Sequence, residues 1–106
     1  MATNSTTTTI AYEVTAEVGV GIRDQFERFM TETHIPDLMA TGCFREAHFE
    51  RIEPGRYRTR YEALDRAALE RYFDEHAARL RAHVEETFPS GIRFEREQWE
   101  TLASFG

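Results

Sequence analysis

The order in which two hydrophobic periods alternate along the chain constrains its fold more than any other feature. Apolar side chains occupy every second position from Ile10 to Val18, which is typical of a strand with one buried face. From Ile22 they recur every three or four residues instead, which predicts an amphipathic helix. Both patterns return farther along, so the chain is expected to combine strands and helices in a fixed order.

The first helix is expected to start near Ile22 and to end or bend near His34. Pro36 is the reason, because a proline disfavours helical backbone geometry at the residue before it, here Ile35. A further short turn can begin at the proline and stop at Gly42, since glycine commonly ends a helix.

Two strands, residues 43–52 and 57–63, flank a proline–glycine turn and are expected to form a hairpin. The charges indicate the register. A three-residue loop places Glu50 opposite Arg58, whereas an even-numbered loop would put Phe49 beside arginine. Opposite charges across neighbouring strands stabilise a sheet, so the first register is preferred.

A second helix is predicted from Asp65, a residue type that favours the N-cap position. One stripe across about five turns carries its inward side chains, namely Leu69, Tyr72, Phe73, His76, Leu80, His83 and Val84. A last strand is expected from Ile92 to about Leu102. Its apolar positions change parity before Trp99, which suggests a bulge.

The resulting order is strand, helix, strand, strand, helix, strand. Right-handed crossovers place both helices on one face of a four-stranded antiparallel sheet of spatial order 4-1-3-2. The sequence therefore predicts an α+β, ferredoxin-like fold. Residues 1–8 are a polar stretch expected to be disordered, and residues 9–106 are expected to form a single domain.

Composition excludes several functions. The formal net charge is −6 and the 13 basic residues, all arginine, are interspersed with acidic ones, so a nucleic-acid surface is not expected. No apolar stretch approaches the roughly 20 residues of a membrane span, and no secretory signal is visible. Cys43 is the single cysteine, so no internal disulfide can form and a cytoplasmic location is expected.

The sheet face without helices is expected to be charged. Glu13 and Glu17 on the first strand lie beside Arg58 and Arg60 on the third. This arrangement of charges is either a solvated surface, in which each ion pair contributes little to stability, or the polar interior of a homodimer in which two such faces meet.

Several motifs resemble a small bacterial family of unknown function that is grouped with the dimeric α/β-barrel superfamily. They are Tyr12-Glu13-Val14-Thr15, His34-Ile35-Pro36-Asp37, Thr41-Gly42-Cys43-Phe44, Tyr61-Glu62-Ala63 and the run from Tyr72 to Arg81. The resemblance spans about residues 10–102. It implies the ferredoxin-like fold and a barrel-type homodimer. It implies no activity, because the wider superfamily includes cofactor-free monooxygenases, haem-dependent enzymes, isomerases and stress-response proteins.

Two histidines are the candidate catalytic residues. His76 lies in the middle of the second helix's stripe, and imidazole titrates near neutral pH, so it is the candidate general base. His34 ends the first helix and is expected to converge on the same pocket. The alternative is that His76 is a neutral core histidine, and that the end of the first helix explains His34 by itself.

Four further residues are candidate binding residues around that pocket, namely Tyr12, Tyr61, Tyr72 and Arg81. A guanidinium group or a tyrosine hydroxyl there would hold an oxyanion during proton abstraction next to a carbonyl.

No metal or cofactor is expected. Glu46, His48 and Glu50 share a strand face, but residues two apart in a strand lie nearly 7 Å apart and do not easily share an ion. One histidine is no signature of a haem site. Cys43 has no catalytic motif around it and is expected to be structural.

The sequence therefore favours a homodimer with a small-molecule pocket between helices and sheet. As an enzyme, it would be expected to perform cofactor-free proton-transfer or monooxygenase-like chemistry. The alternative is a non-catalytic oligomeric binding or accessory module. A cavity of about 300 Å³ or more beside His76 would favour a pocket, and close packing would favour the module.

Overall fold

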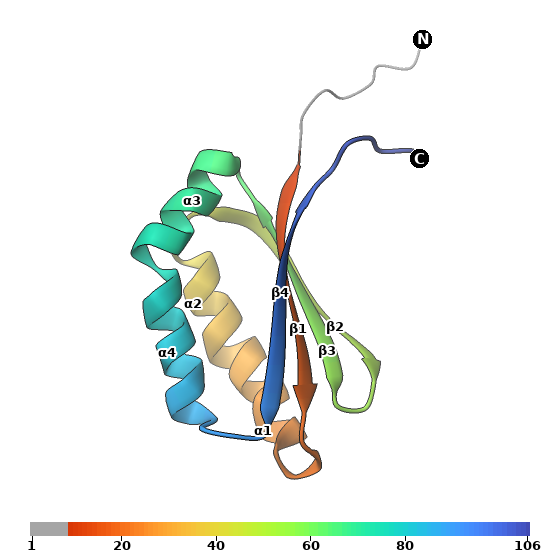
Figure 1. The fold of residues 1–106 in the computed structure, drawn as a ribbon, viewed down its shortest axis with the longest axis vertical. Coiled ribbons are helices and arrows are strands. Elements are labelled where there is room, and N and C mark those ends of the chain that lie inside the picture. The colour runs from red at the N-terminus through yellow and green to blue at the C-terminus, as the bar shows by residue number, and fades with distance from the viewer. Residues whose placement is uncertain (1–8) are drawn as a thin grey trace.

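The computed structural model describes residues 9–106, so the expected disorder of residues 1–8 lies outside it. Four strands form one antiparallel sheet (Figure 1). They are β1 (Ile10–Val18), β2 (Phe44–Glu53), β3 (Arg56–Ala63) and β4 (Ile92–Glu100). The order across the sheet is β2-β3-β1-β4, which is the predicted order read from the opposite edge. The ferredoxin-like fold is confirmed.

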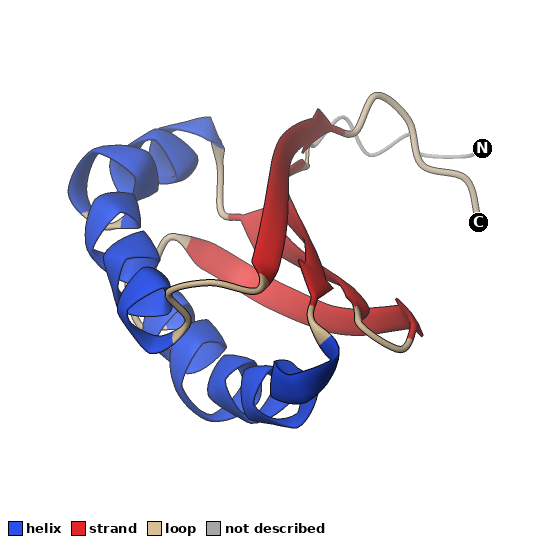
Figure 2. Cartoon of the chain, turned by 60° about the horizontal axis from the view of Figure 1, so that its bottom comes forward, coloured by secondary structure: helices blue, strands red, loops and turns tan. Residues whose placement is uncertain are grey.

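Two helical arms cover one face of the sheet and leave the other face open (Figure 2). The first arm contains α1 (Arg23–Phe29), a π-helical segment (Met30–His34) and α2 (Ile35–Met39). The second contains α3 (Arg66–Glu75) and α4 (Ala77–Thr87). The Asp65 side chain caps α3, because its Oδ1 accepts a hydrogen bond from the backbone N–H of Ala68 at 2.7 Å.

The first helix was predicted to end or bend near His34. It does not end there, because the arm passes through that point by widening its turn. The Ile35 N–H donates to the carbonyl of Met30, five residues earlier, as in a π-helix. In an α-helix the Pro36 ring would collide with the carbonyl four residues before it, and it has no N–H to donate. The wider turn relieves that conflict and lets the helix continue.

The prediction of one uninterrupted second helix is wrong. The chain bends at His76, whose backbone angles are φ −127° and ψ −34°, so that α3 and α4 are separate helices. Both still present their predicted apolar stripe to the sheet, since Leu69 and Tyr72 of α3 and Leu80 of α4 are at most 2% exposed.

The core has two parts, both between the helices and the sheet. One contains Tyr12 and Tyr61 with the apolar side chains of α3 and α4. The other surrounds Phe26, with Tyr57 and Phe88 among its members. The stripe of the second arm therefore lies on the same sheet face as Tyr12 and Tyr61, as the sequence predicts.

The register predicted for the hairpin is confirmed, with Glu50 opposite Arg58. The turn itself is shorter than expected and is compensated by an irregularity in β2 near Ile52. Gly55 in the turn has φ +87°, and a Cβ there would lie 2.6 Å from the Arg23 guanidinium. Both facts favour glycine at this position.

The bulge predicted in the last strand is wrong. β4 pairs with β1 in unbroken register from Ile92 to Glu100. Because the strand keeps its period of two, Trp99 lies on the opposite face from Phe94. Trp99 is therefore on the open face, where it is 48% exposed.

Candidate functional site

A small cavity of about 30 Å³ lies between the helices and the sheet. Both helical arms and three of the four strands, β1, β3 and β4, contribute to its wall. The lining residues are Tyr12, Val14, Met30, His34, Leu38, Tyr61, Tyr72, Arg81, Val84, Phe94 and Arg96. Five of the six candidate residues from the sequence are among them, and the exception is His76.

His34 is held in the wall of the cavity by the π-helical segment. Its ring stacks on Phe29, with 5.9 Å between ring centroids. Its Nδ1 atom is buried and has no hydrogen-bond partner among residues 9–106. Burial lowers the pKa of His34 to about 4; Asp37 opposes this shift, while His83 and Arg96 add to it. The imidazole is therefore neutral at pH 7 and can accept a hydrogen bond or a proton.

Three tyrosines bring phenol groups to the same place. Tyr61 is 1% exposed, and its hydroxyl has no hydrogen-bond partner among the described residues. Its ring stacks on that of Tyr12, with centroids 6.0 Å apart. Burial raises the pKa of both Tyr61 and Tyr72. These hydroxyl groups therefore remain protonated at neutral pH, and that of Tyr61 is free to donate to a ligand.

Arg81 supplies a partly buried positive charge. One terminal nitrogen, Nη2, donates to the Tyr12 hydroxyl at 3.1 Å. The Nε atom is buried without a hydrogen-bond acceptor among residues 9–106. The guanidinium carbon lies 6.0 Å from the centre of the Phe73 ring, which fixes its orientation from the other side.

His76 lies outside the cavity, at the bend between α3 and α4. Its Nδ1 is 3.2 Å from Arg79 and its Nε2 is 3.8 Å from the Glu75 carboxylate. The side chain is 24% exposed. The structure thus brings His34, rather than His76, together with the tyrosines and Arg81.

The sequence analysis missed Arg96 and Phe94. A signal for them was present, because Ile92, Phe94 and Arg96 follow the period of two that places all three on the inward face. The expected bulge concealed it. The Arg96 guanidinium lies 5.2 Å from the centre of the Phe94 ring, and its exposed side chain forms part of the rim.

Other candidate chemistry finds no support in the described part of the chain. Glu46 and His48 are 3.6 Å apart but more than half exposed, and residues 9–106 contain no cluster of ligands suited to a metal ion. Cys43 is fully buried, with its Sγ 3.8 Å from the carbonyl of Thr41.

Within residues 9–106, no helix has the length and apolar character needed to cross a membrane.

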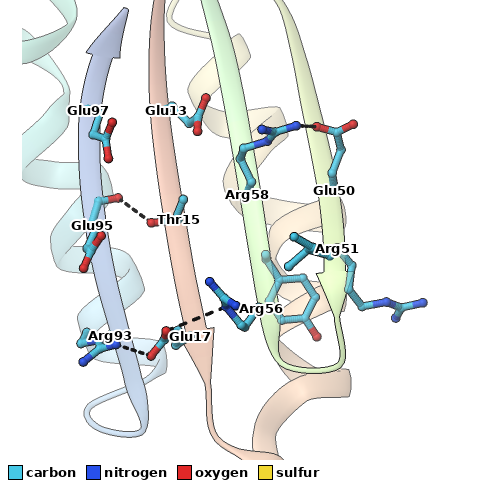
Figure 3. A pocket seen from close by; sticks show the side chains of 12 residues that line it. Glu13, Thr15, Glu17, Glu50, Arg51, Arg56, Arg58, Arg93, Glu95 and Glu97 are labelled. Atoms are coloured by element: carbon cyan, nitrogen blue, oxygen red, sulfur yellow. Dashed lines mark hydrogen bonds and ion pairs between the residues drawn. The ribbon is translucent and has the colours of Figure 1, made fainter.

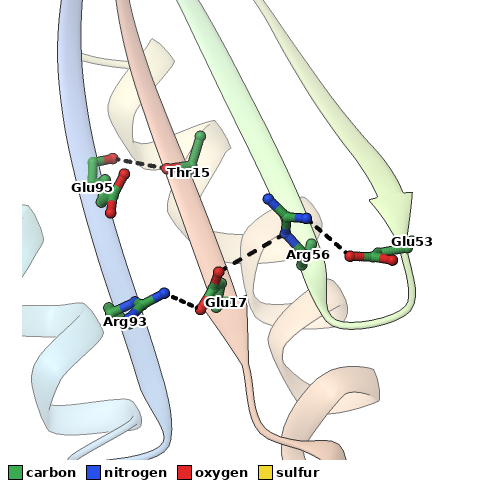
Figure 4. Close-up of polar contacts among 6 residues, drawn as sticks. All are labelled: Thr15, Glu17, Glu53, Arg56, Arg93 and Glu95. Carbon is green, nitrogen blue, oxygen red and sulfur yellow. Dashed lines mark hydrogen bonds and ion pairs between the residues drawn. The ribbon is translucent and has the colours of Figure 1, made fainter.

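The open face of the sheet is a second, broader hollow of about 480 Å³, and it is strongly charged (Figure 3). Arg58 pairs with Glu50 across β2 and β3 at 2.9 Å. Glu17 on β1 lies between Arg93 and Arg56, within salt-bridge distance of both (Figure 4). Half-exposed pairs of this kind contribute little to stability.

The chain matches a known family over almost its whole length. Residues 9–102 match the family described as Domain of unknown function (DUF4286). No curated protein matches the sequence. Solved structures share the fold at low identity. A protein of unknown function from Nitrosomonas europaea is 20% identical with a TM-score of 0.65, and the match covers 92% of this chain and 93% of that one.

Two other similar structures are described as oxygenases. SnoaB, a cofactor-independent oxygenase from Streptomyces nogalater, is 14% identical with a TM-score of 0.70, over 91% of this chain and 95% of that one. A putative antibiotic biosynthesis monooxygenase from Bordetella bronchiseptica is 21% identical with a TM-score of 0.62, over 86% and 96%. At these identities the likeness shows the fold alone.

The fold therefore defines a ferredoxin-like α+β protein with a small cavity between helices and sheet, lined mainly by apolar side chains and by a few polar ones. Within that class, the chain belongs to the DUF4286 family.

Proposed function

We propose that this protein binds a small molecule between its helices and its sheet and removes a proton from it with His34, without a cofactor. The observation that carries the proposal is that three of the residues lining one cavity each have a buried polar atom without a partner among residues 9–106. The atoms are His34 Nδ1, Tyr61 Oη and Arg81 Nε. Buried polar groups are normally hydrogen-bonded, so three in one place favour a site that a ligand completes.

The proposed step is a proton transfer next to a carbonyl group. The substrate C–H bond breaks, the proton moves to Nδ1 of neutral His34, and the electron pair is delocalised onto the substrate oxygen. Tyr61 and Arg81 donate hydrogen bonds to that oxygen as its negative charge develops. The similar structures described as oxygenases are consistent with such a carbanion reacting further with dioxygen.

The cavity must enlarge to admit a ligand, because about 30 Å³ is the space of a single water molecule. Arg96 is exposed at the rim, so its long side chain can swing outward. The small volume also favours the second candidate, a non-catalytic module whose role is assembly.

A ligand screen followed by an exchange assay tests the proposal. The melting temperature is measured with small aromatic acids, phenols, quinones and haem, and each ligand that raises it is incubated in D2O. We expect NMR to show deuterium entering next to the ligand carbonyl, and His34→Gln to slow that exchange by about 100-fold or more.

His48→Gln is the matched control, because His48 is 61% exposed on β2. Its exchange rate should equal that of the wild type. Wild-type exchange in His34→Gln would refute the catalytic role. A screen without any ligand would leave only the assembly role.

We propose further that two copies associate through the open sheet face. Rows of opposite charge support this, since a second copy turned by a two-fold axis can set its arginines against Glu95 and Glu97 of the first. Both glutamates line the open face and form no ion pair within residues 9–106. Trp99 adds an apolar contact on the same face, where it is half exposed.

Size-exclusion chromatography with light scattering at several concentrations measures this association. We expect twice the 12.4 kDa chain mass for the wild type, and a shift to monomer for Trp99→Glu, which would place another charge in the interface. Val20→Glu is the control, because Val20 is 79% exposed away from the sheet face. A strict monomer of wild type at all concentrations would refute the dimer.

A further inference from the structure

We infer that the ligand of the cavity is a small monocarboxylic acid, bound as its anion by Arg81. This inference rests on the proposed function, since it names the class of molecule that the cavity takes. It begins from an imbalance of charge. The chain has 19 acidic residues against 13 arginines, yet the charged residues lining the cavity are Arg81 and Arg96, and none of the lining residues is acidic.

Arg81 differs from the other arginines within residues 9–106, because its Nε atom is buried without a hydrogen-bond acceptor. On the open face, Arg58 and Arg93 each form an ion pair with a glutamate. Neither Arg81 nor Arg96 lies within 4.0 Å of a carboxylate oxygen in residues 9–106. A partly buried guanidinium group without a carboxylate is unusual, because burial favours pairing of charge. The missing carboxylate is therefore assigned to the ligand.

The geometry of Arg81 suits this group. Nη2 is already fixed by its bond to the Tyr12 hydroxyl, which leaves the buried Nε as a donor without an acceptor. The guanidinium group presents its N–H donors in a planar fork that matches the two oxygens of a carboxylate. A lysine or a single hydroxyl group would not provide this match.

The other polar groups add donors without adding negative charge. The Tyr61 hydroxyl is protonated, and Thr59 is the side chain that acts on its pKa by hydrogen bonding. No group within residues 9–106 meets both the distance and the angle of a full hydrogen bond to it, so it can donate to the second carboxylate oxygen. His34 is neutral, and it contributes an acceptor for a proton on the ligand. Asp37 is the acidic residue that acts on His34, but it does not line the cavity.

The remainder of the wall indicates an apolar body for the ligand. It consists mainly of Val14, Met30, Leu38, Val84 and Phe94. A second charged group in this apolar part would lose its hydration, and the other arginine of the wall, Arg96, is exposed at the rim. Dicarboxylates and phosphates are therefore disfavoured, and a single carboxylate on an aliphatic chain or an aromatic ring fits best.

Matched acid–amide pairs test the inference. Binding of acetate, hexanoate and benzoate is measured by calorimetry beside acetamide, hexanamide and benzamide, which have the same shapes without the charge. We expect at least one acid to bind the wild type at least 10-fold more tightly than its amide. Arg81→Met should weaken the binding of that acid much more than the binding of its amide, and so remove the preference.

Two further variants make the result specific. Arg81→Lys keeps the positive charge but lacks the planar pair of N–H donors, so it should retain only part of the preference for acids over amides. It provides the same comparison if the methionine variant does not fold. Arg79→Met is the control, because Arg79 lies on the exposed side of α4 and should leave both affinities unchanged. NMR adds an independent readout, since a bound anion should raise the pKa of His34 in the wild type.

The outcomes separate this inference from the proposed function. Equal binding of acids and amides, or binding of only neutral compounds from the screen, would overturn the carboxylate and leave the pocket standing. An acid preference that survives in Arg81→Met would overturn the role of Arg81. If no compound of either set binds, the proposed function and the inference fall together.

Discussion

The free energy of unfolding should decrease by about 2–3 kcal/mol between pH 7 and pH 4 through His34 alone. The pKa of His34 is about 4 in the folded protein, against its ordinary value of 6.5. Between these values the unfolded chain binds more protons than the folded one. The stabilisation is therefore present above pH 6.5, is lost as the pH falls through 4, and levels off below that.

Urea unfolding at a series of pH values measures this contribution. Carboxylates titrate over the same range, so the quantity of interest is the difference between the wild type and His34→Gln. That difference should depend on pH, whereas the difference between the wild type and His48→Gln should remain small. Asp37, His83 and Arg96 act on His34 from neighbouring elements, and they are present in all three proteins.

The ring resonances of His34 provide a direct check. We expect the proton on the ring carbon between the two nitrogens to titrate with a midpoint below pH 5. A midpoint near 6.5, or parallel stability curves for the wild type and His34→Gln, would contradict burial of the imidazole in the cavity wall.

Phe26→Ala should lower the free energy of unfolding by about 3–5 kcal/mol, the range found for large aromatic side chains in a tightly packed core. Phe26 is 1% exposed. Its ring lies 5.1–6.5 Å from those of four other aromatic residues, namely Phe49, Tyr57, Phe88 and Phe94. Removing it would leave a void at the point where the first arm meets the sheet.

Urea unfolding of Phe26→Ala beside Phe26→Leu checks this prediction. Leucine retains most of the apolar volume, so its loss should be clearly smaller. A loss below about 2 kcal/mol for the alanine variant would show that the arm repacks, in contrast to the close packing around Phe26.

The fold could be predicted because each element has its own local signal. The alternation from Ile10 to Val18 and the stripe containing Leu69 and Leu80 each have one period, and the order of elements allows few topologies. The hairpin register followed from charge, since only one register sets Glu50 against Arg58. These signals depend on neighbours close in sequence or directly across a strand.

The details of the site depend on packing that local signals do not contain. The sequence located the effect of Pro36 on the backbone correctly. Whether the helix ends there or continues depends on packing against the sheet, which a local signal does not contain. The bend at His76 follows from no proline or glycine in the second arm. The bend turns the His76 ring toward Arg79. The histidine that lines the cavity is therefore His34. Arg96 was missed because a regular strand was taken for a bulged one.

The π-helical segment has a consequence for how such a site can vary. Phe26 and Leu38, twelve positions apart in the sequence, are both buried against the sheet, whereas three turns of a regular α-helix span about 11 residues. The arm therefore contains one residue more than its two anchors require. Deleting a solvent-facing residue such as Thr31 would restore a regular helix between the same anchors and change the direction of His34. Insertions and deletions in this arm can thus change the direction of the imidazole in related chains without replacing any residue that surrounds it.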